Sequence, residues 1–274
     1  MRVRHLDCGP MRPLGGSLVD GRPGLLRPAE VCCHVLVVES ADGLVLVDSG
    51  FSRADLTTPR GTLPPPFLLV ARPRLDPAVT AFEQLKALGH DPADVRHIIL
   101  THLDLDHVGG ISDFPEAAVH VHGPEFRAAM NPRTAAEKTR YRKAQWAHGP
   151  KWQVHEPAGG DRWFGLESVR PLPDLPEDDF LLVPLPGHTR GHAGVAVRTD
   201  SGWLLHAGDA YFHRDQLNPT PSIPPLLKAF EARAQTIAET RLANQQRLRD
   251  LHRDNDGITV FSAHDNTELT RFTS

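Results

Sequence analysis

The chain has 274 residues, a formal net charge of −4 at pH 7 and hydrophobic side chains at 40% of its positions. This composition allows a proper core without disulfides and excludes the overall positive field that attracts nucleic acid or anionic lipid. The N-terminus lacks the apolar segment of a signal peptide, and no stretch approaches about eighteen apolar residues. Three cysteines, two of them adjacent, are a poor disulfide framework. We therefore expect a cytoplasmic protein that acts on a small molecule, not on nucleic acid or a membrane.

The first half of the chain alternates short apolar runs with helical patterns. Runs at residues 35–38 and 44–47 flank Ala41-Asp42-Gly43, which is a hairpin signal. The segment 51–75 is rich in proline and predicts a long functional loop. Further along the chain we predict a helix that starts at Asp76 and ends at Gly89, strands at 97–100 and 119–122, and a helix over 124–143 that breaks at Pro132.

The second half adds more strands, which we predict at residues 181–185, 194–198, 203–206 and 258–261. One long amphipathic helix is predicted over about 226–252. A polar insert at about 131–170 is a candidate lid or homodimer contact, and the sequence leaves both open. Hairpins together with strand–helix alternation predict the α/β class, in one domain over residues 1–274, with sheets covered by helices.

Four candidate metal ligands fall within six positions of the segment Thr101-His102-Leu103-Asp104-Leu105-Asp106-His107-Val108-Gly109-Gly110. This segment follows a buried strand directly, and a loop at a strand end can aim such side chains at one point. Imidazole nitrogen and carboxylate oxygen suit zinc, iron, cobalt or manganese. Capping of a helix near Val108 would explain one aspartate but not two aspartates and two histidines. The segment therefore predicts a metal site.

Three later fragments repeat the same arrangement, in which an apolar strand delivers a candidate ligand at its end. They are His188 after 181–185, Asp209 after 203–206 and His264 after 258–261. A single polar residue in a loop is a weak signal, but the repetition predicts that all three join the same centre.

In this order the fragments resemble the metallo-β-lactamase superfamily, whose signature is His-x-His-x-Asp-His, then a later His, an Asp and a final His. The resemblance covers residues 35–265 and implies an αβ/βα four-layer sandwich, in which helices cover two facing mixed β-sheets. It also implies two divalent metal ions at one edge of the sheets. Carried over to this chain, the metal ligands would be His102, Asp104 and His188 for metal one, Asp106, His107 and His264 for metal two, and Asp209 as the bridge. Asp48 would orient a ligand histidine from behind.

Asp104 departs from the family's pattern, which usually has a histidine there. A carboxylate adds negative charge and a hard oxygen donor, which favours iron or manganese more than an imidazole does. Zinc is our first choice for both ions, with iron or manganese as alternatives because of Asp104. A geometry in which Asp104 points away, so that metal one lacks a third protein ligand, stays open.

The resemblance implies hydrolysis by a water that both metals share and whose pKa they lower toward about 7. The resulting hydroxide would attack a carbonyl carbon, and Asp106 would take or relay a proton. Tyr211, two positions after Asp209, is a candidate hydrogen-bond donor to the intermediate, because quorum-quenching lactonases of this superfamily use a tyrosine shortly after the bridging aspartate. In this chain the offset is one residue short and Phe212 occupies the matching position, so a buried structural tyrosine is the alternative.

The chain also looks like the lactonase branch of the superfamily. The proline-rich segment 51–75 and the long C-terminal helix would line an apolar mouth for an acyl chain. We therefore expect hydrolysis of a carboxylic ester, first of all an N-acyl homoserine lactone-like lactone. The alternatives are a thioester hydrolase of the glyoxalase II type, which a basic pocket would support, an iron redox enzyme and a non-catalytic binding protein. The last is disfavoured, because gathering so many polar side chains without a metal is costly.

Of the 16 histidines, four are predicted ligands. His122 and His192 stand nearest to the motifs and are candidates for supporting or substrate contacts. The remaining predicted non-ligands are His5, His34, His90, His97, His120, His148, His155, His206, His213 and His252.

Overall fold

The computed structural model describes residues 1–156, 162–168, 172, 174–176 and 179–273. Its strands are β1 (Arg2–Asp7), β2 (His34–Ser40), β3 (Gly43–Val47), β4 (Val95–Ile99), β5 (Ala118–His122), β6 (Lys151–His155), β7 (Arg162–Trp163), β8 (Leu166–Glu167), β9 (Phe180–Pro184), β10 (Ala193–Thr199), β11 (Gly202–His206) and β12 (Ile258–Phe261). Its α-helices are α1 (Ser17–Asp20), α2 (Arg53–Thr57), α3 (Pro65–Val70), α4 (Ala81–Ala87), α5 (Leu105–Val108), α6 (Gly123–Met130), α7 (Ala135–Arg140), α8 (Pro225–Ala234), α9 (Ala238–Asp254) and α10 (Asn266–Thr273). Short 3₁₀ turns are η1 (Pro59–Gly61), η2 (Pro77–Val79), η3 (Pro92–Asp94), η4 (Gly109–Asp113), η5 (Lys143–Trp146) and η6 (Arg214–Leu217).

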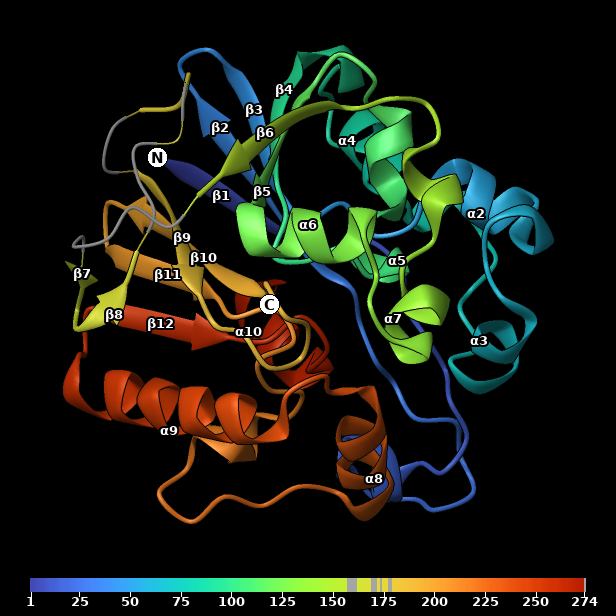
Figure 1. The fold of residues 1–274 in the computed structure, drawn as a ribbon, viewed down its shortest axis with the longest axis vertical. Helices are drawn as coiled ribbons and strands as arrows, with labels where there is room; N and C mark the ends of the chain where they lie inside the picture. The colour runs from blue at the N-terminus through green and yellow to red at the C-terminus, as the bar shows by residue number, and fades with distance from the viewer. Residues whose placement is uncertain (157–161, 169–171, 173, 177–178, 274) are drawn as a thin grey trace.

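Two mixed sheets face each other (Figure 1). Strands β1 to β6 form one sheet in chain order, antiparallel up to β3 and parallel from β3 to β6. The other large sheet has the order β12-β11-β10-β9, with β11 and β12 parallel. Strands β9, β11 and β12 therefore point in the same direction and end at the same edge of their sheet.

The space between the sheets is filled with buried aliphatic side chains. Val47 and Ile99 of the first sheet pack in one cluster with Leu182 and Val195 of the second. Alternate side chains along each strand point to the outer face, where helices cover them. Leu85 of α4 joins the outer cluster of the first sheet, and α9 packs beside β12 on the outer face of the second (Figure 1). The four layers confirm the predicted αβ/βα sandwich. Within the described ranges, no helix has the length and apolar character to cross a membrane.

The predicted helix over 226–252 is wrong as one element, because the chain forms α8 and α9 with a break between them. Gln235 and Ile237 leave the helical region, with ψ angles of 147° and 94°. The amide of Thr236 donates to the carbonyls of Gly187 and His188, at 2.9 and 3.0 Å, and the amide of Ile237 donates to Gly187 at 2.8 Å. Backbone donors of the break are thus used to hold the loop that carries His188.

The helix predicted from Asp76 also begins later than expected. Asp76 caps only the 3₁₀ turn η2, and α4 starts after Thr80, whose side chain accepts a hydrogen bond from the amide of Glu83. Two N-cap residues in succession divide the segment, because each satisfies the free amides of its own turn.

The insert predicted at 131–170 contributes to the fold. Strand β6 extends the first sheet in parallel with β5. Trp146 packs in the outer cluster of the first sheet, and Trp163 in that of the second. Residues 157–161 and 169–170 of the insert lie outside the described residues. Its roles as a lid or homodimer contact remain predictions.

Three histidines on neighbouring strands form a chain of ring-to-ring contacts. His97 Nδ1 lies 3.0 Å from His120 Nε2, and His120 Nδ1 lies 3.0 Å from His155 Nε2. Each contact needs one protonated and one bare nitrogen, so a neutral His120 fits both. Burial, and secondly the neighbouring His155 and His97, lower the pKa of His120 to about 3. A proton that His120 binds readily in the unfolded chain is therefore excluded from the fold.

We expect the protein to lose stability on mild acidification because of these three linked histidines. The folded pKa of His120 lies below its ordinary value of about 6.5, so its contribution is present above pH 6.5 and falls as pH decreases toward 3. Between pH 7 and pH 5, His120 should lower the free energy of unfolding by about 2 kcal/mol. Urea unfolding at both pH values should show a smaller loss in His120→Gln. The exposed His252→Gln variant should follow the wild type, and an equal loss in His120→Gln would refute the assignment.

Candidate metal centre

The candidate ligands converge because each follows the end of a strand. Asp48 follows β3, and His102 follows β4 by three positions. Asp106 and His107 lie on the short helix α5, with Asp104 at its N-cap position. His188, Asp209 and His264 come after β9, β11 and β12, whose ends share one edge of the second sheet. The repeated strand–ligand pattern of the sequence thus brings all seven predicted ligands to one place.

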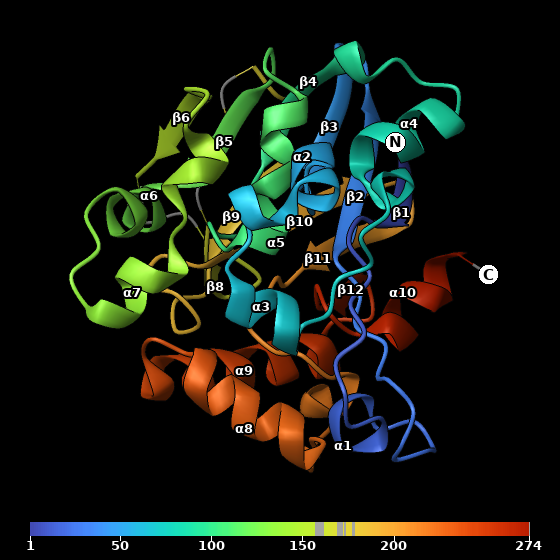
Figure 2. The ribbon, with the colours of Figure 1, turned by 90° about the vertical axis from the view of Figure 1, so that its right-hand side faces the viewer.

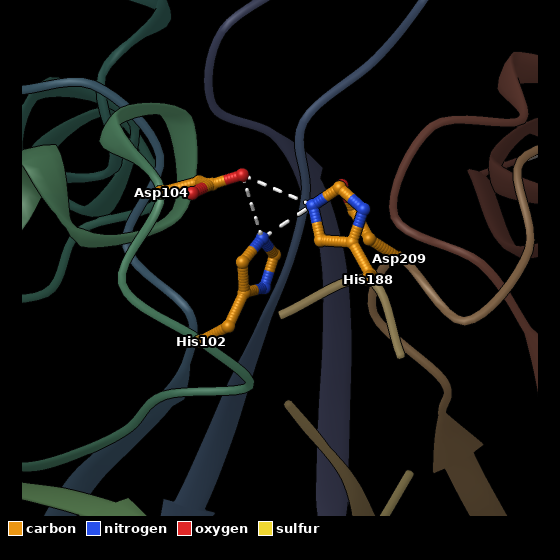
Figure 3. A group of neighbouring side chains, drawn as sticks. All are labelled: His102, Asp104, His188 and Asp209. Carbon is orange, nitrogen blue, oxygen red and sulfur yellow. Dashed lines mark hydrogen bonds and ion pairs between the residues drawn. The ribbon is translucent and has the colours of Figure 1, made fainter. Parts of the chain in front are cut away.

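His102, Asp104, His188 and Asp209 form the first cluster (Figure 3). Asp104 Oδ2 lies 3.4 Å from His102 Nε2 and 3.0 Å from His188 Nε2. Asp209 Oδ2 lies 3.7 Å from His102 Nε2 and 3.3 Å from His188 Nε2. Asp104 therefore points into the cluster, against the alternative in which it points away.

The second cluster shares Asp209 with the first. Its other oxygen, Oδ1, lies 3.3 Å from His107 Nε2 and 3.1 Å from His264 Nε2. Asp106 Oδ2 lies 3.6 Å from His264 Nε2. Each oxygen of Asp209 thus faces a different cluster, which is the arrangement expected of a bridging carboxylate.

Both clusters fit a divalent cation. Ligand bonds of 2.0–2.2 Å in a tetrahedral arrangement separate neighbouring donor atoms by about 3.3–3.6 Å, close to the distances above. Among the described residues, the buried atoms His102 Nε2, Asp104 Oδ1 and Asp209 Oδ1 have no hydrogen-bond partner. Buried polar atoms without a partner are costly, and a metal ion would satisfy them.

The electrostatics of the clusters also favour a cation. Burial raises the pKa of Asp104, but Arg140 and His102 outweigh burial and hold it well below its usual range. Burial also raises the pKa of Asp209, but the four histidines around this carboxylate outweigh burial and keep its pKa well below the usual range. For His107, burial lowers the pKa, yet Asp209 and Asp48 raise it well above the ordinary value. Protons on such histidines balance the carboxylates, and metal binding would replace them.

Comparison with known proteins identifies the family. A model of the metallo-beta-lactamase superfamily matches residues 31–264. The chain belongs to the metallo-β-lactamase superfamily. It is a hydrolase of the metallo-β-lactamase fold, and this superfamily typically binds divalent metals.

The relatives of this metallo-hydrolase include lactonases. A probable metallo-hydrolase of Mycobacterium tuberculosis is 43% identical over 267 residues, which cover 97% of this chain and 80% of the relative. The N-acyl homoserine lactonase AttM of Rhizobium johnstonii is 31% identical over 245 residues, covering 89% and 85%. A solved N-acyl homoserine lactone hydrolase with N-hexanoyl-L-homoserine bound at its catalytic metal centre has a TM-score of 0.71 and 21% identity, over 98% of this chain and 95% of that one. At that identity the structural likeness shows the fold alone.

Asp48 holds the metallo-hydrolase's centre from behind, as the resemblance implied. Its Oδ2 lies 2.8 Å from His107 Nδ1, and its carboxylate accepts hydrogen bonds from the amide and hydroxyl of Thr101. This fixes the His107 ring so that Nε2 faces Asp209. Asp48 has a φ of 57°, a backbone conformation that favours glycine and that aspartate tolerates better than most residues.

Two supporting residues were not predicted from the sequence. Glu125, fully buried on α6, accepts from the amides of Leu103 and Gly191 at 3.0 and 3.2 Å and from the Thr189 hydroxyl at 2.6 Å. It thereby joins the His102 loop to the His188 loop. Arg140, at the end of α7, donates to Asp104. Neither residue lies in a recognisable motif, although a glutamate in the first turn of a helix directly after a strand is a weak signal.

Tyr211 does not occupy the position predicted for a catalytic residue. It is fully buried in the outer cluster of the second sheet, where its hydroxyl donates to Glu268 Oε1 at 3.0 Å. Phe212 faces the centre in its place, with its ring stacked 5.3 Å from that of His264. The turn after Asp209 thus sends Tyr211 into the core and Phe212 toward the metal ligands, which corrects the proposed role of Tyr211.

His122 and His192 both support the loops. His192 Nε2 accepts from the amide of Asp209 at 2.9 Å, and His122 Nδ1 lies 2.8 Å from the carbonyl oxygen of Gly191. Neither lines the cavity beside the centre, which fits a supporting role better than substrate contact.

Proposed function

We propose that this metallo-hydrolase opens the ring of N-acyl homoserine lactone-like esters. The proposal assigns two divalent metal ions, with zinc first and iron or manganese as alternatives, to the seven predicted ligands. It is supported by the 31% identity to a lactonase that spans most of both chains. The small-molecule substrate, the cytoplasmic location and the homodimer remain predictions.

The observation that carries the proposal is a cavity of about 880 Å³ next to the candidate metal centre. Its polar end includes Asp104, Asp106, His188, Asp209 and His264. The larger part of its wall is apolar and comes from three segments, with Leu14, Val19, Phe67, Leu69, Val70, Leu226, Leu227 and Phe230. Helix α8, which supplies part of this wall, lies beside α1 (Figures 1 and 2). A cavity with a reactive polar end and an apolar wall fits an ester with an acyl tail.

The chain's own residues would divide the work of hydrolysis. When bound, divalent cations would lower the pKa of a coordinated water to about 7 and polarise the ester carbonyl. Asp106 lines the cavity beside His264, where its carboxylate can hold a proton from water and pass it to the leaving alkoxide oxygen. Phe212 and the apolar wall would exclude water from the acyl tail and orient the lactone ring of the substrate toward the metal ligands.

Thioester hydrolysis is the second candidate, because Arg22, Arg140 and Arg142 line the same cavity. A basic pocket would suit an anionic thiol carrier. Two of these charges are already compensated, since Arg22 lies 2.7 Å from Glu30 and Arg140 lies 2.7 Å from Asp104. The lactone therefore stays the first choice.

A substrate panel tests the function. Protein purified without chelator, with its metal content measured, would be assayed on acyl homoserine lactones of increasing chain length, simple aryl esters and a glutathione thioester. We expect the highest kcat/KM on a lactone. Higher kcat/KM on the thioester would favour the second candidate, and no hydrolysis of any ester by metal-loaded protein would refute the proposal.

Chain-length preference should depend on the apolar wall. Phe230, which is 49% exposed and lines the cavity, is replaced by aspartate. We expect kcat/KM for a ten-carbon acyl lactone to fall about tenfold or more relative to a four-carbon one, because this equals the loss of about two buried methylenes. Leu242, which is similarly exposed on α9 but does not line the cavity, gives the matched control Leu242→Asp. An equal effect on both chain lengths would place the acyl tail elsewhere.

A further inference from the structure

Arg140 brings a permanent positive charge into the candidate metal centre from the insert. Its Nη1 lies 2.7 Å from Asp104 Oδ2 and 2.9 Å from His188 Nε2. Its Nη2 donates to the carbonyl oxygen of Ala234, the last residue of α8. The side chain is 15% exposed, and a guanidinium keeps its charge at any physiological pH. It is therefore held in place on both sides.

Arg140 and a metal ion need the same electron pair of His188. A guanidinium donates all its N–H groups and accepts none, so a hydrogen bond across the 2.9 Å contact uses the lone pair of His188 Nε2. In that tautomer the 3.0 Å contact of the same nitrogen with Asp104 Oδ2 is not a hydrogen bond. An imidazole nitrogen has one lone pair and serves one partner at a time. A metal ion that binds His188 Nε2 has to displace Arg140 from it, and it also approaches a carboxylate whose charge Arg140 already compensates.

The described residues provide no such competitor at the second cluster. Across the part of the chain that the structure describes, no lysine or arginine forms an ion pair or hydrogen bond with Asp106, His107 or His264. The groups that these atoms face include Asp209 and the buried thiol of Cys33, and neither of the two is a cation.

We propose that Arg140 makes the two halves of the centre unequal in metal affinity. The half with His107 and His264 binds the first divalent ion tightly. The half with His102, Asp104 and His188 binds the second ion more weakly, because Arg140 competes for His188 and shares Asp104. This inference rests on the two-metal site assigned under the proposed function, and it makes Arg140 a positioning residue that sets metal occupancy.

Zinc titration of the folded protein tests the inference. Metal-free protein would compete with a chromogenic chelator for zinc, and elemental analysis would give the number of ions bound. For the wild type we expect one tight and one weak ion. Arg140→Met should raise the affinity for the weakly bound ion about tenfold or more, and it should change the affinity for the tightly bound ion by less than about threefold. Arg140→Lys keeps a positive charge with fewer donors, so its affinity for the weakly bound ion should lie between those of the wild type and Arg140→Met. His102→Ala should remove the weak ion alone.

Arg142→Met is the matched control, because Arg142 lines the same cavity without contacting the predicted ligands. It should leave both affinities unchanged. Two equally tight ions in the wild type, or an unchanged weak ion in Arg140→Met, would overturn the inference. Lactone hydrolysis by the zinc-saturated wild type is measured separately. Hydrolysis together with an unchanged weak-site affinity in Arg140→Met would refute this inference and leave the proposed function standing. The expected affinities without any lactone hydrolysis would refute the proposed function and leave this inference standing.

Discussion

Replacing Asp209 by asparagine should lower kcat/KM on the best lactone at least about 100-fold. The two oxygens of Asp209 face different clusters, at 3.1–3.3 Å from the nearest histidine nitrogens of each. Asparagine keeps the shape but removes the charge and replaces one oxygen by an N–H donor, which repels a cation. Bound metal should fall below two ions per chain. Both effects are measured on the same preparation by steady-state kinetics and elemental analysis.

The matched control is Asp113→Asn. Asp113 is also largely buried, but it pairs with Arg53 and does not line the cavity. Its replacement should leave kcat/KM and metal content near the wild-type values. Circular dichroism would check that both variants fold. Near-normal turnover together with two bound ions in Asp209→Asn would contradict the assignment of the bridge.

Glu125→Ala should have the largest effect on stability. Its carboxylate accepts hydrogen bonds from Leu103, Thr189 and Gly191, and a fourth from the Tyr141 hydroxyl at 3.2 Å. Alanine leaves these buried donors without an acceptor, which should lower the free energy of unfolding by about 3 kcal/mol or more. Urea unfolding of the metal-free protein measures it. The His102 and His188 loops should also lose their common support, so zinc affinity should fall.

Glu125→Gln separates charge from geometry, because its amide oxygen retains two acceptor positions. The variant should lose less stability than Glu125→Ala. The exposed Glu116→Ala, which breaks only a surface pair with Lys151, should change the free energy of unfolding far less. Wild-type stability in Glu125→Ala would mean that the loops are held by other contacts.

The α/β class, most strands and the seven candidate ligands could be predicted from the sequence. Each depends on a local signal: an apolar run short enough for a strand, followed at once by a side chain that binds metal. Strands β2 to β5 and β9 to β12 all appear near their expected positions. A resemblance spread over residues 35–265 then implied the four-layer arrangement of two facing sheets covered by helices, which no single segment specifies.

Only the tertiary structure decided features that depend on distant partners. Helices α8 and α9 separate because the backbone donors of Thr236 and Ile237 bind the loop at Gly187, about fifty positions earlier. Tyr211 turns into the core because Glu268 accepts its hydroxyl hydrogen bond there.

Glu125 and Arg140 act on residues that lie far along the chain. Arg140 contacts the predicted ligand His188, and Glu125 accepts a hydrogen bond from Thr189, the next residue of the same loop. The sequence by itself determined which side chains are able to bind a metal, because that ability belongs to the residue type and to the strand before it. Which charges and donors surround those side chains was decided by the fold, because hydrogen bonds and charge pairs act over a few ångströms in space whatever the separation in sequence.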